Sequence, residues 1–385
     1  MREQYFLDPD IIFLNHGSFG ATPRDVMAVY REWQDRLERQ PVQFITRELL
    51  PELKKARQIL GDYVNADADN LVYIPNATFG VNIIARSLQL EPGHEVLTSD
   101  HEYGACDNVW DFIGQKKGTV HKKMPIPLPV ASPVEIAEHF WQGVTPRTRV
   151  IFISHITSPT AVRLPVDLIC QRAREAGILT IIDGAHAPGQ ITLDLKSIDP
   201  DFYIGNCHKW LQSPKGAGFL YTRKALQNLL EPLVISWGWG QGSSFTSGTK
   251  YLDYFEWSGT NDPSAYLAVP AAIQFQRQHH WTTVQQQCQQ ILAAGLKCID
   301  GLTGLESVYS VHAAPFVQMG VVRLPRLRDI LAFQRQFFEQ YRIEVPCIEW
   351  NGQHFMRISV QGYNSTADVN ALVAAMEPLL PLHQA

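Results

Sequence analysis

Lys209 lies where its amine could act as a nucleophile. It follows the apolar segment 201–206 and precedes Trp210 and a turn that contains proline and glycine. Lysine is usually a solvated surface residue. At the end of a buried strand, however, desolvation lowers the pKa of the amine and makes it reactive toward carbonyl groups. A single lysine at a strand end is a weak signal, so the hypothesis depends on the residues placed around it.

Polar residues also follow four other apolar segments, residues 71–74, 95–98, 149–153 and 178–182. Apolar segments that alternate with helices are typical of a parallel sheet covered on both faces. Ligands of such sheets bind beyond the carboxyl ends of the strands. A turn or a helix cap explains any one polar residue, but their repetition at successive strand ends predicts a shared crevice. The residues concerned are Asn76, Thr78, Tyr103, His155, Ser158, Asp183, His186, His208 and Lys209.

An aromatic aldehyde that carries a phosphate would use each of these groups. Lys209 would form a Schiff base, and Asp183 would hold a proton on the ring nitrogen, which is the pairing used by pyridoxal phosphate (PLP) enzymes. Tyr103 would stack on the ring. The remaining contacts would be phosphate binding by Thr78, His208 and the N–H of Ala77 at a helix start, and hydrogen bonds from His186 and Ser158 to the ring hydroxyl. Helix capping by Asn76 or Thr78 is an alternative explanation for the segment that begins that helix.

The chain resembles the class V aminotransferase family of fold-type-I PLP enzymes, from Asn15 to about Asn364. The family includes cysteine desulfurases, cystine lyases and isopenicillin N epimerases. The strings that carry the resemblance are NATFGVN, DHEYGA, SHITSPT, DGAHAPG, CHKW, WSGTNDPSA and MRISVQGYN. LNHGSFG and VPCIEWNG add similarity to the isopenicillin N epimerase-like branch, which also resembles sulfoxide C–S lyases.

The resemblance implies an α/β fold, the fold-type-I PLP-dependent transferase fold. We expect a large domain with a mainly parallel, doubly covered sheet and a small α+β C-terminal domain. The expected boundaries are 1–257 for the N-terminal segment with the PLP-binding domain, and 258–385 for the small domain. Residues 229–257, rich in glycine and aromatic residues, are expected to form a long loop.

The resemblance also assigns roles to individual residues. Lys209 is the Schiff-base lysine, Asp183 the ring-nitrogen partner and Tyr103 the stacking residue, where relatives often have histidine. Thr260 is expected to reach the cofactor of a neighbouring subunit, which implies a homodimer. The remaining cofactor contacts are Ala77, Thr78, Ser158, His186 and His208, with Asn206 where relatives often carry a phosphate-binding serine.

Substrate binding is assigned to Arg357, Asn15 and His16. The planar guanidinium of Arg357 suits a carboxylate, although a surface arginine on a strand is the alternative. Asn15 and His16 precede Gly17 and Gly20, where the backbone could press close to a ligand or only make a turn.

The implied reaction begins at Cα of an amino acid, through an external aldimine and a carbanion, with Lys209 as base and Tyr103 or His186 as candidates for a second acid. We expect an epimerase of the isopenicillin N epimerase type. The alternatives are a C–S lyase acting on cystine, a cysteine conjugate or a sulfoxide, then a cysteine desulfurase or an aminotransferase. A catalytically silent PLP-binding protein stays open, whereas a nicotinamide enzyme is disfavoured because no GxGxxG follows a strand.

Composition narrows the class of protein further. The net charge of −5 over 385 residues gives no electrostatic footprint for nucleic acid, and no apolar run is long enough for a membrane span. The N-terminus has no signal-peptide core. The six cysteines are scattered without a CxxC pair, so we expect no metal site, reduced thiols and a cytoplasmic location. Cys347 lies among apolar residues, which disfavours a reactive desulfurase cysteine.

Overall fold

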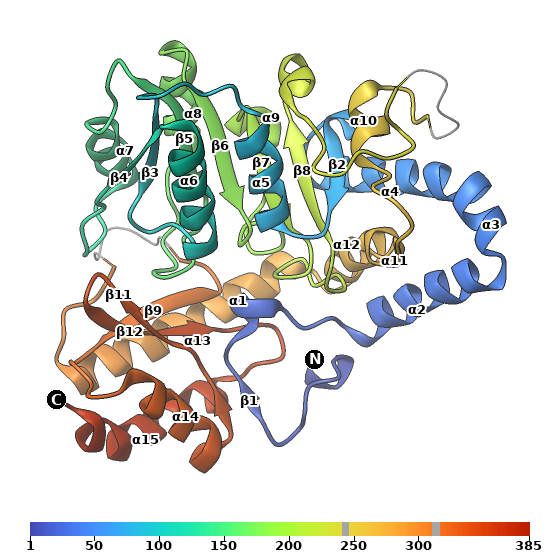
Figure 1. Ribbon diagram of the computed structural model, residues 1–385. Helices are drawn as coiled ribbons and strands as arrows, with labels where there is room; N and C mark the ends of the chain where they lie inside the picture. Colours follow the sequence, from blue (N-terminus) through green and yellow to red (C-terminus); the bar gives the residue numbers. More distant parts are fainter. Residues whose placement is uncertain (241–245, 310–315) are drawn as a thin grey trace.

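A seven-stranded sheet forms the centre of the larger part of the computed structural model, which describes residues 1–240, 246–309 and 316–385 (Figure 1). The strand order is β2-β8-β7-β6-β5-β3-β4. β8 runs antiparallel to both its neighbours, and the other pairs are parallel. The predicted mainly parallel sheet is therefore confirmed. The strands are β2 (Leu71–Ile74), β3 (Glu95–Ser99), β4 (Val120–Met124), β5 (Thr148–Ser154), β6 (Leu179–Gly184), β7 (Phe202–Asn206) and β8 (Gly218–Thr222).

Apolar side chains cover both faces of this sheet. On β5, Val150 and Phe152 belong to one buried cluster, and Ile151 and Ile153 belong to the other. Because successive side chains of a strand point to opposite faces, an unbroken apolar run is what a strand buried on both sides requires. One cluster contains residues of α5 (Ala77–Ser87) and α6 (Gly104–Lys117), and the other contains residues of α7 (Pro133–Trp141) and α8 (Val166–Glu175).

A three-stranded antiparallel sheet, in the order β11-β12-β9, forms the smaller part with three helices (Figure 1). The N-terminal strand β1 (Ile12–Phe13) pairs in parallel with β10 (Ile343–Glu344), so the N-terminal segment joins the smaller part. The expected α+β composition of this part is confirmed. Its elements are β9 (Met319–Leu324), β11 (Cys347–Trp350), β12 (Gln353–Ser359), α13 (Trp281–Thr303), α14 (Ile330–Tyr341) and α15 (Thr366–His383).

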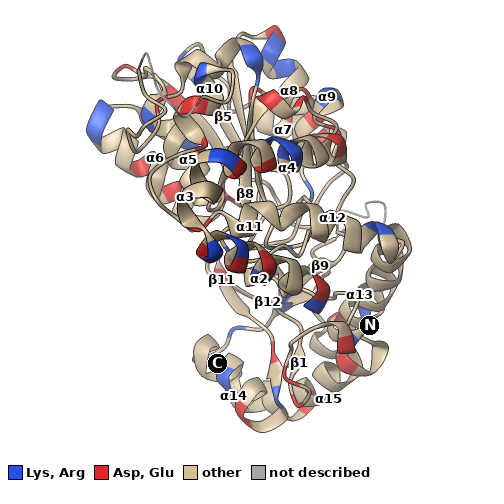
Figure 2. Cartoon of the chain, turned by 90° about the vertical axis from the view of Figure 1, so that its right-hand side faces the viewer, with Lys and Arg blue, Asp and Glu red and all other residues tan. Residues whose placement is uncertain are grey.

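Helices from distant parts of the chain pack together beside the large sheet. α11 (Ser264–Leu267) and α12 (Val269–Gln278) contact α2 (Arg24–Arg39) and α4 (Leu49–Val64). Figure 2 shows acidic and basic residues interspersed along α2 and α4. The predicted boundary between residues 257 and 258 stays a prediction. The other short elements are α1 (His16–Phe19), α3 (Pro41–Gln43), α9 (Leu195–Ile198), and the turns of helix at Arg2–Gln4, Phe44–Glu48, Ala68–Asn70 and Lys224–Leu229.

The segment 229–257 is not the unbroken loop that we predicted. It contains α10 (Lys250–Phe255), whose first turn is capped by the Thr249 hydroxyl, which accepts a hydrogen bond from the N–H of Leu252 at 3.2 Å. Residues 241–245 of this segment lie outside the described residues. β4 was not predicted, because a strand with the sequence VHKKM contains no apolar run and lies at the edge of the sheet.

A buried ion pair ties the end of this segment to α4. The side chains of Arg57 and Glu256 are 1% and 3% exposed, and their charged groups are in contact. Glu256 also accepts a hydrogen bond from the Ser247 hydroxyl at 2.7 Å. Burial lowers the pKa of Arg57, and the carboxylate of Asp69, 3.6 Å away and largely exposed, acts in the opposite direction. Glu256 is the buried carboxylate that the guanidinium contacts directly.

We expect Glu256→Gln to destabilise the fold by about 3 kcal/mol, because it leaves the Arg57 charge buried without its main counter-ion. Thermal or urea unfolding measures the change. Lys55→Ala removes an exposed ion pair with Glu52 on the same helix and should cost less than about 0.5 kcal/mol. Equal losses in the two variants would contradict this account.

Candidate functional site

A cavity of about 380 Å³ opens at the carboxyl ends of β5, β6 and β7. It brings together all the residues predicted to bind the cofactor except Thr260, which is exposed and lies outside it. These residues are spread over more than a hundred positions of the sequence. They lie together because their strands end at the same edge of the sheet, as predicted. The lining residues are Ser18, Phe19, Asn76, Ala77, Thr78, Tyr103, Cys106, Ser154, Ile156, Ser158, Asp183, Ala185, His186, Asn206, His208 and Lys209.

The Lys209 amine lies at the centre of this group. Its Nζ is 3.1 Å from Nε2 of His186. Burial lowers the pKa of the amine to about 8; the Arg357 charge lowers it too, while Asp183 acts in the opposite direction. A lysine with this pKa is largely uncharged under mildly alkaline conditions, as a nucleophile toward an aldehyde must be.

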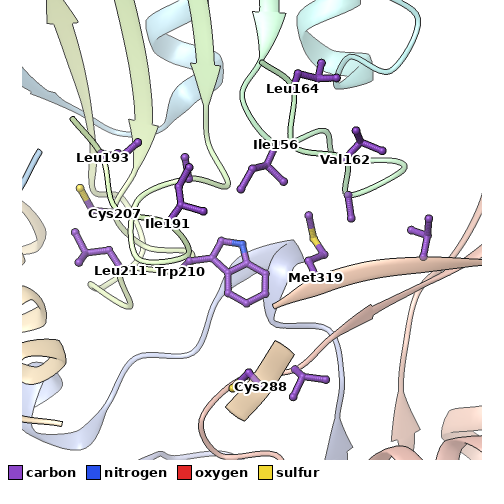
Figure 3. Packing of buried hydrophobic residues seen from close by; sticks show 14 of the residues in the cluster. Ile156, Val162, Leu164, Ile191, Leu193, Cys207, Trp210, Leu211, Cys288 and Met319 are labelled. Carbon is purple, nitrogen blue, oxygen red and sulfur yellow. The ribbon is translucent and has the colours of Figure 1, made fainter. Parts of the chain in front are cut away.

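Trp210 decides the protonation of His186. The indole Nε1 of Trp210 is 3.2 Å from Nδ1 of His186 and can only donate, so Nδ1 accepts. Burial lowers the pKa of His186 well below its usual value, which keeps the ring neutral with its proton on Nε2, facing Lys209. Figure 3 shows Trp210 packed near Ile191, Leu211 and Met319, in the buried cluster that fixes the indole. Of these, Met319 belongs to β9 of the smaller sheet.

Asp183 presents a buried carboxylate to the cavity. It is 4% exposed. Oδ1 accepts the N–H of Ala185 at 2.9 Å, and Oδ2 has only the thiol of Cys106 at 3.5 Å among the residues described. Burial raises the pKa of Asp183, against the opposing effects of these donors and of Lys209. A thiol is a weak donor, so Oδ2 is suited to a protonated ring nitrogen.

The N-terminus of α5 forms the side of the cavity predicted to hold phosphate. Asn76 caps the helix by accepting the N–H of Phe79 at 3.0 Å, and Asn206 accepts the N–H of Ala77 at 2.8 Å. The predicted phosphate donor Ala77 is thus engaged by Asn206, the residue whose role the sequence left open. His208 is anchored through Nδ1 to the carbonyl of Ala217 at 3.0 Å, which leaves Nε2 for a ligand.

Arg357 reaches the cavity from β12 through two serines that line it. Nη1 donates to the carbonyl and hydroxyl oxygens of Ser158 at 2.7 and 3.2 Å, and Nη2 donates to the Ser18 hydroxyl at 3.0 Å. Arg357 is 6% exposed, and the Nε of its guanidinium has no hydrogen-bond partner among the described residues. Burial lowers the pKa of Arg357 to about 10. A buried cation without a carboxylate partner is suited to an anionic ligand.

Asn15 and His16 do not line the cavity, in contrast to their predicted contact with substrate. Asn15 accepts the Ser18 hydroxyl at 2.6 Å and so supports a partner of Arg357. His16 is fully buried, with its nitrogens 2.9 Å from the Tyr363 hydroxyl and 3.0 Å from the carbonyl of Lys209. Burial lowers the pKa of His16 to about 3. Both ring nitrogens are engaged, so His16 holds the Lys209 loop.

Several residues of the cavity were not predicted from the sequence. Ser18, Phe19, Cys106 and Ser154 line it, and Trp210 lies behind it. Ser154 ends the strand β5, so its position resembles that of the predicted residues at the other strand ends. Cys106 lies on α6, and only the packing of that helix against the sheet brings it to Asp183. No group of histidine, cysteine or acidic residues suited to a metal ion is found in the described parts of the chain.

The donor set fits PLP at three points: a lysine amine with a lowered pKa, a buried carboxylate that lacks a strong donor, and a helix N-terminus with His208 beside it. Within residues 1–240, 246–309 and 316–385, no helix has the length and apolar character needed to cross a membrane.

Comparisons with known proteins agree with this assignment. The family model described as Aminotransferase class-V matches residues 21–372. The isopenicillin N epimerase of Amycolatopsis lactamdurans is 34% identical over 98% of this chain and 97% of that protein. The hercynylcysteine sulfoxide lyase of Schizosaccharomyces pombe is 26% identical over 96% of this chain and 94% of that protein. A solved C-DES mutant with glycine covalently linked to its PLP cofactor has a TM-score of 0.82 at 21% identity, covering 98% and 99% of the two chains.

We expect Lys209→Ala to abolish the borohydride-stable attachment of PLP to the protein, measured by mass spectrometry of the intact chain. In the parent protein the rate of attachment should rise with pH through about 8, because the uncharged amine is the reactive form.

Lys215→Ala is the matched control. Lys215 lies in the same loop and donates to the carbonyl of Gly20 at 3.0 Å, outside the cavity. It should keep the label on Lys209, and a label that survives in Lys209→Ala would refute the assignment.

Proposed function

The chain belongs to the class-V aminotransferase family, and from that premise we propose that it acts at Cα of an amino acid as an epimerase of the isopenicillin N epimerase type. The enzyme class and the cofactor, PLP, are those of the family. The observation that carries the proposal is that one cavity holds the Lys209 amine and the Asp183 carboxylate and is reached by the Arg357 guanidinium. The 34% identity to an isopenicillin N epimerase along nearly the whole chain supports the choice of reaction.

Each of these groups has a defined task in removing a proton from Cα. Bound PLP supplies an electron sink that stabilises negative charge at that carbon. Asp183 keeps a proton on the ring nitrogen, and Arg357 holds the substrate carboxylate so that Cα faces Lys209. The Lys209 amine, with its pKa lowered to about 8 mainly by burial, accepts the Cα proton.

Epimerisation also needs a group that returns a proton. Tyr103, half exposed at the cavity, and His186, with its Nε2 proton 3.1 Å from Lys209 Nζ, are the two candidates. Reprotonation from the face opposite Lys209 inverts the centre, so the group that does this must reach that face.

A C–S lyase is the second candidate. The full-length similarity to a hercynylcysteine sulfoxide lyase favours it. The first step is the same, since both reactions remove the Cα proton. The outcomes differ because a lyase expels a β-sulfur group before a proton returns.

A desulfurase and a catalytically silent PLP-binding protein are weaker candidates. Cys347 is buried at the start of β11 and does not line the cavity, and burial raises the pKa of its thiol. Cys106 does line the cavity, but burial and the nearby Asp183 carboxylate raise the pKa of its thiol as well. Both thiols therefore stay protonated, and a thiolate nucleophile is disfavoured. The catalytically silent protein is disfavoured because the cavity combines a base, Lys209, with a ring-nitrogen partner, Asp183, and a carboxylate-binding group, Arg357.

We also propose a homodimer in the cytoplasm. Thr260 is exposed outside the cavity, as a residue that serves a neighbouring site must be. Five large apolar residues of the segment 233–239 are exposed: Leu233, Val234, Ile235, Trp237 and Trp239. An apolar stretch of this kind is typical of an interface. All six cysteines are free thiols, as a reducing compartment requires.

Proton NMR in heavy water tests the reaction, with a panel of amino acids that includes cystine and thioethers. An epimerase should exchange the Cα proton for deuterium while the amino acid survives, and chiral analysis should then find both enantiomers. Pyruvate with a sulfur product would instead establish the lyase and overturn the epimerase proposal.

Arg357→Lys should raise KM by about tenfold or more with a smaller effect on kcat, because an ammonium cannot replace a bidentate guanidinium on a carboxylate. Arg323→Lys is the matched control, since Arg323 lies on the adjacent strand β9 and donates to Gln353. Unchanged KM in Arg357→Lys would refute the carboxylate role.

Hybrid dimers test the proposed role of Thr260. In a mixture of Lys209→Ala and Thr260→Ala chains, one site of each hybrid combines an intact Lys209 with an intact Thr260 from its partner. Activity should therefore exceed that of either variant alone after the subunits are exchanged. No recovery in hybrids isolated with two different tags would refute a contribution across subunits.

A further inference from the structure

A second buried acid, Glu102, lies beside Asp183 and has no part in the proposed reaction. It is 5% exposed and lies between the end of β3 and the start of α6. Its carboxyl group contacts two hydroxyl groups, Ser99 Oγ at 2.5 Å and Ser154 Oγ at 2.6 Å. Ser99 ends β3 and Ser154 ends β5, so Glu102 joins the carboxyl ends of two neighbouring strands.

Ser154 connects this acid to the cavity. It lines the cavity, and in the β5–β6 ladder it is the register partner of Asp183. Register partners in a parallel pair lie side by side on the same face of the sheet. Among the described residues, Glu102 is the one hydrogen-bond partner of Ser154 Oγ. The hydroxyl can therefore make further hydrogen bonds, and it lines the same cavity as Asp183.

The two carboxyl groups cannot both be ionised at low cost, since both are buried and each destabilises the charge of the other. Asp183 has an N–H donor, a thiol donor and the nearby Lys209. Glu102 has hydroxyl groups only. Burial raises the pKa of Glu102 to about 8, and the Asp183 and Asp107 charges act in the same direction. At neutral pH the proton of the pair accordingly stays on Glu102.

The charged and titratable groups around Glu102 come from two further elements. β6 contributes Asp183, and α6 contributes Asp107 and the Cys106 thiol. Asp107 is paired with Lys123 at 2.7 Å, which offsets its charge. Asp183 is therefore the main charge that adds to the effect of burial on Glu102.

We propose that Glu102 is a protonated acid that acts through Ser154 as a positioning residue for Asp183. A protonated Glu102 donates to Ser154 Oγ, and the Ser154 hydroxyl is then free to donate into the cavity toward the Asp183 carboxylate. When Glu102 loses its proton, the Ser154 hydroxyl turns and donates to Glu102 instead, because an ionised carboxylate can only accept a hydrogen bond. Asp183 then loses a donor and gains a neighbouring negative charge. The inference rests on the proposed role of Asp183 at the ring nitrogen.

The test uses the PLP-loaded enzyme and two readouts taken over the same pH series. Infrared difference spectroscopy follows the protonated carboxyl group, and visible absorbance follows the bound cofactor. In the parent protein the carboxyl signal should disappear with a midpoint near pH 8, and part of the absorbance change should share that midpoint.

Glu102→Gln keeps the shape of the side chain and donates to Ser154 at every pH. It should lose the carboxyl signal and the absorbance change that accompanies it, while the neutral-pH spectrum stays that of the parent. Ser154→Ala should keep the carboxyl signal, but the absorbance of the cofactor should no longer change at the same pH. The variant lacks the hydroxyl through which Glu102 acts on Asp183. Ser99→Ala is the matched control: it removes a donor to Glu102 and spares Ser154, so both midpoints should move together to higher pH.

An absorbance change in Glu102→Gln with the parent midpoint would overturn the inference, and so would an absorbance change in Ser154→Ala that still follows the carboxyl signal. Failure of the proposed function looks different. It would appear as an enzyme that shows these paired signals but exchanges no Cα proton, or as a chain that takes up no PLP in any variant.

Discussion

The removal of the Lys209 amine from water is the constraint on which the site depends. A lysine at the surface keeps its proton and has no nucleophilic or basic character at neutral pH. Here burial lowers the pKa of the amine to about 8. That burial needs a rigid wall, which Trp210 and His186 provide on one side. The carbonyl of Lys209 is in turn held by His16, from the N-terminal segment.

The N-terminal segment is part of the site because of how closely its backbone approaches the lysine loop. Gly20 has φ +72°, and a Cβ there would lie 2.0 Å from the carbonyl oxygen of His208. Only glycine allows this approach, so the segment that follows β1 can pass directly over the loop. The same segment supplies Ser18, which orients Arg357. Three regions of the chain therefore complete the cavity: the N-terminal segment, the Lys209 loop and β12. They lie far apart in the sequence.

The charges of the cavity are balanced as a group. Arg357, Asp183 and Glu102 are buried and Lys209 is partly buried. Burial shifts the pKa of each of the four toward the neutral form. Charges that survive in such a site are those with partners. Arg357 has only neutral partners in the described chain, and Asp183 has one weak donor on Oδ2. Arg357 is therefore suited to bind an anionic group of a ligand, and Oδ2 of Asp183 is suited to bind a cationic one.

The parallel sheet and most of the cavity follow from the amino-acid sequence alone. Buried strands must be continuously apolar, and the polar residues that interrupt them at their carboxyl ends, such as Asp183 and His186, must meet at one edge. The sequence also identified Lys209, Asp183 and Arg357 through the family resemblance. Local patterns did not determine the edge strand β4, because its sequence is polar, or α10, because glycine and aromatic residues surround it.

Which of the polar residues are free to react depends on how the chain packs in three dimensions. His16 and Asn15 have the residue types of binding groups, but their hydrogen bonds are used within the protein. Ser154, Cys106 and Glu102 acquire their places from the packing of α6 and the register of β5 with β6. Hydrogen-bond partners and burial depend on residues far away in the chain. Residue type and spacing therefore predict where a group lies along a strand but not whether its polar atoms remain available.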